Sequence, residues 1–148
     1  MEWMDLALQQ AELAAGLGEV PVGAVLVDAC TNRLVAKAHN QMRARNNPLA
    51  HAEILVLEQA FQQTGQHRLL DHQLYVTLEP CPMCAQAISF ARIKTLYFGA
   101  YDPKGGGVEH GAHIFEVASC FHKPHYWGGI QEVQCSTLLK TFFKTLRC

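Results

Sequence analysis

Two short blocks of the sequence contain soft and borderline metal ligands that could bind the same ion. The first block is His51-Ala52-Glu53, and the second is Pro80-Cys81-Pro82-Met83-Cys84. An imidazole and two thiolates are ligands that Zn²⁺ prefers. Three protein ligands would leave the fourth tetrahedral position for water, as in catalytic rather than structural zinc sites. The fold of the chain therefore has to bring these two blocks together.

Each block stands near the predicted start of a helix. Pro82 favours a helix that begins directly after Cys81, and residues three apart, such as Cys81 and Cys84, share one side of a helical turn. The positive end of this helix would lower the thiol pKa values and favour the thiolate form. His51 similarly precedes an apolar helical pattern. We therefore predict His51, Cys81 and Cys84 as metal ligands.

Glu53 is the candidate for proton transfer. It follows His51 by two residues and points roughly 200° away from it around a regular helix, so it does not share the helix face of the metal ligand. From there its carboxylate could reach the water side of the metal. The alternatives are a closed four-ligand zinc knuckle, or two ordinary thiols beside an unrelated histidine. The pairing of the two blocks argues against both alternatives.

The length of 148 residues predicts one domain, residues 1–148, and 49% hydrophobic content is enough for a packed core. No apolar run approaches the roughly 20 residues that span a bilayer. The sequence begins with acidic rather than basic residues, unlike a signal peptide. We predict the four cysteines outside the metal site to be reduced thiols: Cys30, Cys120, Cys135 and Cys148. These features predict a cytoplasmic protein without a membrane segment.

The net charge of −1 gives little general attraction to nucleic acid. The charge is unevenly distributed, however, because two stretches contain basic residues and no acidic residues. Their basic residues are Arg33, Lys37, Arg43 and Arg45 in the first, and Lys140, Lys144 and Arg147 in the second. These stretches are either solvated surface or a rim that contacts phosphates.

Hydrophobic periodicity predicts alternating strands and helices. We expect strands at residues 22–27, 34–39, 74–78, 95–100 and 130–134, and helices at 2–17, 50–63, 82–91, 112–119 and 136–147. Strand–helix–strand steps imply parallel strands with right-handed crossovers. The expected fold is a three-layer α/β/α sandwich on a mixed five-stranded sheet. Ligands in such sheets bind outside the carboxyl ends of strands, where residues 79–84 and Asp102 fall.

Gly105, Gly106 and Gly107 form a run that lacks the strand–helix context and the lysine spacing of a phosphate-binding loop. We interpret the run as part of a mobile loop beside the pocket.

The paired blocks resemble the H-x-E…P-C-x-x-C signature of the zinc-dependent nucleoside and nucleobase deaminases. Further blocks follow the order and spacing of the bacterial tRNA-specific adenosine deaminases: residues 19–25, 50–54, 77–81, 98–100 and 102–104. The resemblance implies a cytidine-deaminase-like fold with one zinc per subunit. It also implies hydrolytic deamination of adenosine to inosine, by zinc-activated water, at the wobble position of a tRNA anticodon arm.

The resemblance also assigns roles to individual residues. It implies zinc ligation by His51, Cys81 and Cys84, with Glu53 as the catalytic residue. The substrate-binding residues that it implies are Asn40 for the base, Val20, Ala52 and Leu78 as pocket walls, and Asp102 for the sugar. A homodimer is expected, because family members build the RNA surface from both subunits.

The sequence differs from the family pattern on the substrate side and not at the zinc ligands. The differing residues are Asn47, Leu49, Glu109, His110 and Phe121, and the sequence lacks the basic helical extension that many members carry after the last helix. These differences leave two alternatives open. One is a deaminase of a free nucleobase or nucleoside, of the guanine or cytosine type, and the other is a non-catalytic zinc or RNA-binding module.

Overall fold

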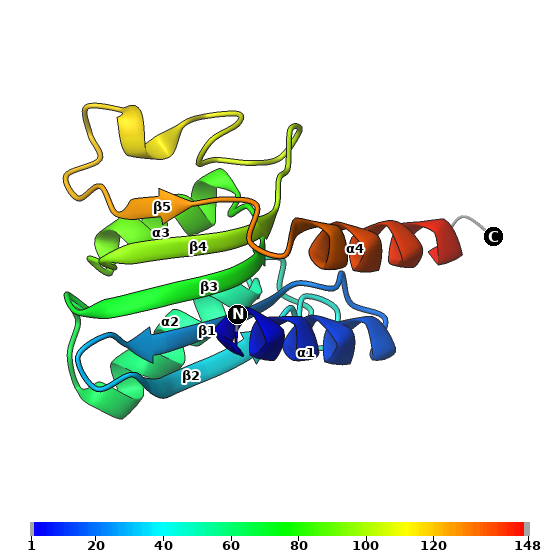
Figure 1. Cartoon of the computed structure of the whole chain (residues 1–148), viewed down its shortest axis with the longest axis horizontal. Coiled ribbons are helices and arrows are strands. Elements are labelled where there is room, and N and C mark those ends of the chain that lie inside the picture. The colour runs from blue at the N-terminus through cyan, green and yellow to red at the C-terminus, as the bar shows by residue number, and fades with distance from the viewer. Residues whose placement is uncertain (1, 147–148) are drawn as a thin grey trace.

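The computed structural model describes residues 2–146, which form one sheet with helices on both of its faces (Figure 1). The elements in chain order are α1 (Glu2–Gly16), β1 (Gly23–Asp28), β2 (Arg33–His39), α2 (Ala52–Thr64), β3 (His72–Leu78), α3 (Pro82–Phe90), β4 (Thr95–Ala100), the 3₁₀ helix η1 (Ile114–Glu116), β5 (His125–Trp127) and α4 (Glu132–Leu146).

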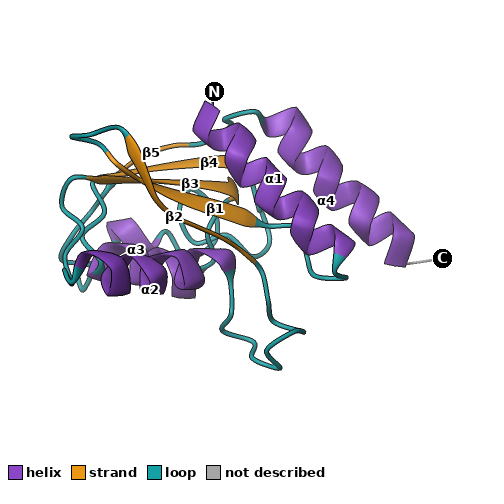
Figure 2. Cartoon of the chain, turned by 90° about the horizontal axis from the view of Figure 1, so that it is seen from below, coloured by secondary structure: helices purple, strands orange, loops and turns teal. Residues whose placement is uncertain are grey.

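The sheet has the strand order β2-β1-β3-β4-β5. β1 runs antiparallel to β2 and to β3, whereas β3, β4 and β5 are parallel to one another. Helices α2 and α3 cover one face, and α1 and α4 cover the other (Figure 2). The predicted three-layer sandwich on a mixed five-stranded sheet is therefore confirmed. Of the two predicted strand–helix–strand steps, only β3–α3–β4 joins adjacent strands, because β1 lies between β2 and β3.

Helix α1 packs closely against the sheet at the start of β1. Its inner face consists of small residues, and Ala7 and Ala11 are completely buried. A Cβ atom added to Gly23, at the start of β1, would stand 2.0 Å from the backbone oxygen of Ala7 and 2.6 Å from the backbone nitrogen of Ala11. The backbone of α1 therefore packs directly on the backbone of β1, and a glycine is required at the point of contact.

Three sequence predictions about the last third of the chain were wrong. The strand predicted at residues 130–134 does not form; instead β5 spans His125–Trp127, and α4 begins at Glu132 rather than at residue 136. β5 is a short edge strand whose His125 and Trp127 are exposed. The hydrophobic pattern of the sequence therefore does not mark it as a strand. Val133 suggested a strand but is 74% exposed on α4. The helix predicted at 112–119 is reduced to η1. The predicted end of the last helix, Arg147, lies outside the described residues.

The cysteines outside the metal site agree with the prediction of reduced thiols. Cys30 is exposed, Cys120 and Cys135 are buried, and all three are free; Cys148 lies outside the described residues. Between residues 2 and 146, no helix has both the length and the apolar content needed to cross a membrane.

Candidate active site

His51 and Cys81 each stand at the residue immediately before a helix. His51 precedes α2 and Cys81 precedes α3, and both have an extended backbone (φ −76°, ψ 150° and φ −70°, ψ 171°). Their carbonyl oxygens accept the first helical hydrogen bonds, from Leu55 at 3.0 Å and from Ala85 at 2.8 Å. Pro82 opens α3, where a missing N–H costs nothing. The two helix starts therefore hold both residues in fixed positions.

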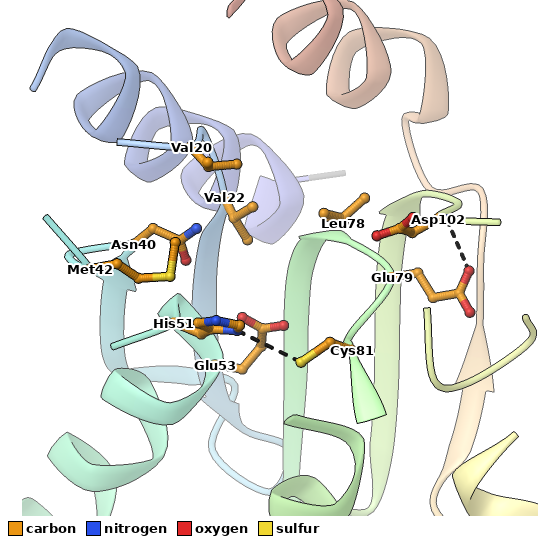
Figure 3. Close-up of a pocket in the computed structure, with 10 residues that line it drawn as sticks. All are labelled: Val20, Val22, Asn40, Met42, His51, Glu53, Leu78, Glu79, Cys81 and Asp102. Carbon is orange, nitrogen blue, oxygen red and sulfur yellow. Dashed lines mark hydrogen bonds between the residues drawn. The ribbon is translucent and has the colours of Figure 1, made fainter. Parts of the chain in front are cut away.

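The three predicted ligand atoms converge, and Figure 3 shows two of the residues, His51 and Cys81. Nδ1 of His51 is 3.4 Å from Sγ of Cys84 and 3.7 Å from Sγ of Cys81, and all three atoms lie within 4.8 Å of one another. A tetrahedral ion bonded at about 2.3 Å to sulfur and about 2.0 Å to nitrogen would separate the nitrogen from each sulfur by about 3.6 Å. The donor types and their spacing therefore suit a metal ion.

Without a bound cation, the two thiols hold one proton between them. The hydrogen bond with Cys84 is the main cause that lowers the pKa of Cys81 to about 4, and the hydrogen bond with His51 acts in the same direction. The same contact with Cys81, followed by burial, raises the pKa of Cys84. The hydrogen bond to Cys81 also raises the pKa of His51. One thiolate therefore forms readily, and a cation would favour the second.

Glu53 lies at the floor of the pocket, between His51 and Cys81 in the view of Figure 3. It stands in the first turn of α2 and is 4% exposed. Burial raises the pKa of its carboxyl to about 7 in the protein alone. A carboxyl with a pKa near neutrality can both take up and release a proton at physiological pH. Its location and its acidity therefore fit the predicted role in proton transfer.

A cavity of about 170 Å³ opens above these groups. Its lining includes Val20, Val22, Asn40, Met42, His51, Glu53, Leu78, Glu79, Cys81 and Asp102. Sites that enclose a drug-sized ligand measure about 300–1,000 Å³, so this cavity suits a single ring system whose substituents extend outward. Four of the five predicted substrate-binding residues line it.

The fifth predicted substrate residue, Ala52, is completely buried and acts through its backbone. Its N–H donates a hydrogen bond of 2.8 Å to Oδ1 of Asn40. This contact fixes the orientation of the Asn40 amide, because the carbonyl side is already engaged and the NH₂ group remains as a donor. Ala52 is therefore outside the cavity lining and holds the side chain of Asn40 in place.

Sequence reasoning did not identify Val22 and Met42 as part of the lining, and it placed Glu79 at the ligand-binding edge of the sheet without giving it a role. Val22 lies two residues after Val20 and just before β1, so its place in the lining could have been inferred. Met42 lies in the loop between β2 and α2, for which periodicity gives no placement. Its location depends on tertiary packing.

Comparison with known proteins identifies the family. The model of the MafB19-like deaminase family matches residues 1–147. A tRNA-specific adenosine deaminase of Agrobacterium fabrum is 48% identical over 145 residues, which are 98% of this chain and 94% of that protein. The chain belongs to the tRNA-specific adenosine deaminase family. A solved structure from a study of A-to-I editing by tRNA:A34 deaminases has a TM-score of 0.90 at 48% identity, covering 93% of this chain and 99% of that one.

Other deaminases share the fold of this family member at lower identity. A guanine deaminase from Nitrosomonas europaea has a TM-score of 0.82 at 19% identity, covering 95% of this chain and 82% of that one. At such identity the likeness concerns the fold alone. The cytidine-deaminase-like fold is confirmed, and the alternative of a free-nucleobase deaminase is not favoured.

The residues that depart from the family pattern lie away from the three ligand side chains. Leu49 is 55% exposed and Phe121 is 85% exposed. Glu109 and His110 belong to the loop that follows Asp102, and both donate backbone hydrogen bonds to Glu79. These departures therefore leave the metal-binding groups unchanged in this member of the family.

Proposed function

We propose that this chain is a cytoplasmic zinc-dependent hydrolase, folded as one domain, that converts adenosine to inosine at the wobble position of a tRNA anticodon arm. The observation that carries the proposal is the convergence of His51, Cys81 and Cys84 within 4.8 Å, beside the buried Glu53. The sequence identity of 48% to a tRNA-specific adenosine deaminase supports the choice of substrate.

The residues of the site would divide the chemistry between them. His51, Cys81 and Cys84 would hold one zinc ion, and bound zinc lowers the pKa of water toward neutrality. Glu53 would take a proton from the attacking water and give it to the ring nitrogen, and it would then take the second proton, from the hydroxyl added to the ring carbon, and give it to the departing amine. The net reaction consumes one water and releases one ammonia for each inosine formed.

The walls of the cavity suit an adenine base. Val20 and Leu78 offer apolar surfaces on opposite sides of it (Figure 3). The NH₂ group of Asn40 can donate to a ring nitrogen, because the Asn40 carbonyl is held by Ala52. Asp102 stands at the outer edge of the same cavity, where its carboxylate could accept a hydrogen bond from a ribose hydroxyl.

A second hollow favours a polynucleotide over a free base. It measures about 450 Å³ and shares Val20, Leu78 and Asp102 with the first cavity. Its other side is formed by α4, which contributes Lys140 and Phe143. A cation and an aromatic ring are suited to a phosphate and to a stacked base. An RNA could therefore place one base in the first cavity and continue across the second.

The direct test is to incubate the zinc-loaded protein with an anticodon stem-loop that carries a wobble adenosine. We expect inosine and an equal amount of ammonia. The matched control is the same stem-loop with a wobble guanosine, and free adenosine, guanine and cytosine are assayed in parallel. Ammonia from a free base, together with no inosine in the stem-loop, would contradict the proposal and support a nucleobase deaminase.

An apolar surface on α2 and α3 is the proposed homodimer interface. Phe90 is 69% exposed, and it borders a hollow of about 330 Å³ with Ile54, Leu57 and Phe61. Apolar side chains grouped on one surface commonly mark protein contacts. Phe61 and Phe90 lie in the last turns of α2 and α3, whereas the metal-binding residues stand at the amino ends of these helices.

We expect the wild-type protein to be dimeric and the Phe90→Glu variant to be mainly monomeric, because a carboxylate would be buried without a partner at the interface. Multi-angle light scattering measures both masses. The control is Val133→Glu, which places the same charge on an equally exposed residue of α4 and should stay dimeric. A monomeric wild type, or a Phe90→Glu dimer, would remove this interface.

A further inference from the structure

Glu79 is a buried carboxylate that the proposed chemistry does not use. It stands between Leu78, the last residue of β3, and Pro80, which opens the metal-binding block. Its side chain is 0% exposed, yet it supplies none of the three atoms that could bind a metal. A buried charge needs several hydrogen-bond donors to be stable. The identity of these donors shows what Glu79 does.

All the donors come from residues 102–110, which form a loop beside the pocket. Oε1 accepts hydrogen bonds from the backbone N–H of Asp102 at 3.1 Å and from Nδ1 of His110 at 2.9 Å. Oε2 accepts from the backbone N–H groups of Val108 at 3.3 Å, and of Glu109 and His110 at 2.9 Å each. Because an ionised carboxylate only accepts, Nδ1 of His110 carries the proton. One side chain thus joins the two ends of the loop.

The loop packs against Glu79 and the metal-binding block without space for side chains. A Cβ atom on Gly106 would stand 2.5 Å from Oε2 of Glu79, and one on Gly107 would stand 2.6 Å from the nitrogen of Pro82. The N–H of Gly107 also donates to the carbonyl of Pro80 at 2.8 Å. Gly106 and Gly107 therefore have a packing role that the sequence did not indicate.

We propose that Glu79 is a positioning residue that fixes this loop and, through it, the place of Asp102 at the substrate pocket. The proposal rests on the proposed function, because Asp102 matters there as a substrate contact. Burial opposes the ionisation of Glu79, but the hydrogen bonds with Asp102 and His110 outweigh it and lower its pKa. Figure 3 shows the link between the two acidic residues at the edge of the cavity.

Glu79→Gln tests this arrangement with almost no change of shape. In either orientation, the new NH₂ group would face at least one backbone N–H donor, so at least one hydrogen bond becomes a repulsive contact. His110→Ala is a milder second variant, because it removes one of the five contacts from a side chain that is 37% exposed. Glu19→Gln is the matched control: Glu19 is equally buried, but it holds the opposite loop through the N–H groups of Arg43 and Ala44.

The first readout is cleavage of the loop by trypsin after the exposed Lys104, followed by mass spectrometry. We expect Glu79→Gln to raise the rate of this cleavage about 10-fold to 100-fold, as for local opening after loss of a charged hydrogen bond. His110→Ala should give a smaller rise, and Glu19→Gln should give none. This readout does not depend on any activity.

The second readout separates positioning from general damage. For Glu79→Gln we expect one zinc per chain, a kcat for the stem-loop within about 2-fold of the wild type, and a KM about 10-fold to 100-fold higher.

Unchanged cleavage at Lys104 in both Glu79→Gln and His110→Ala would overturn the proposal, and so would loss of zinc or a fall in kcat alone. If Glu79→Gln fails to fold, His110→Ala decides. If the wild type makes no inosine, the proposed function fails, and the cleavage rates alone decide whether Glu79 fixes the loop.

Discussion

Glu53→Gln is expected to lower the rate of inosine formation by about 10²-fold to 10⁴-fold or more, which is the usual contribution of general acid–base catalysis. Glutamine has nearly the shape of Glu53 but cannot take a proton from water at neutral pH. The variant should keep one zinc per chain, because Glu53 supplies none of the three ligand atoms. Single-turnover assays on the stem-loop and elemental analysis of the same samples measure both quantities.

The variant should also fold well, which keeps this test interpretable. Burial raises the pKa of Glu53 to about 7 in the protein alone, above its ordinary value of 4.5. The metal-free wild type therefore loses stability as the pH rises from about 4.5 through about 7, whereas the Gln variant lacks this loss. At pH 8 the metal-free variant should be at least as stable as the wild type. A variant that retained most of the activity would exclude Glu53 as the proton carrier.

Removal of the metal is expected to abolish activity and to lower the melting temperature. A ligand that binds only the folded state contributes about 2.7 kcal/mol at a free concentration of 100 Kd, which corresponds to roughly 5–11 °C in Tm for a chain of this size. Chelation should remove this increment, and added zinc should restore it. Calorimetry with and without zinc measures the shift.

Cys84→Ala should be inactive and should show no zinc-dependent shift in Tm, because it loses one of three ligand atoms. The matched control is Cys30→Ala, since Cys30 is exposed and lies outside the ligand group; it should respond to zinc as the wild type does. A Cys84→Ala protein that still bound one zinc would show that this site is not the metal centre.

The convergence of His51, Cys81 and Cys84 was expected from the sequence and is present in the structure, and local signals account for much of it. His51 and Cys81 each stand just before a helix, and helix starts can be located from apolar periodicity and from Pro82. The strands β1, β3 and β4 are buried on both faces and therefore appear as continuous apolar runs. Helix starts and apolar runs are both defined by residues that are close together in the sequence.

The parts that the sequence did not reveal depend on contacts between distant segments. β5 is exposed at the sheet edge, so its three residues form a strand only because β4 offers backbone groups to pair with. The hydrogen bond from the N–H of Ala52 to Asn40 joins residues twelve apart in the sequence. Glu79 carries a charge beside a recognisable block, yet its partners follow more than twenty residues later. Periodicity contains no information about such partners.

The close contact of α1 with the sheet has a consequence for how the sequence can drift over evolutionary time. Gly23 lies against the backbone of α1, while its neighbour Val22 lines the cavity. A larger residue at Gly23, Ala7 or Ala11 would tilt the helix and displace Val22. Positions that never meet the substrate should therefore tolerate few replacements, and a deep mutational scan would find intolerant sites on both faces of the sheet.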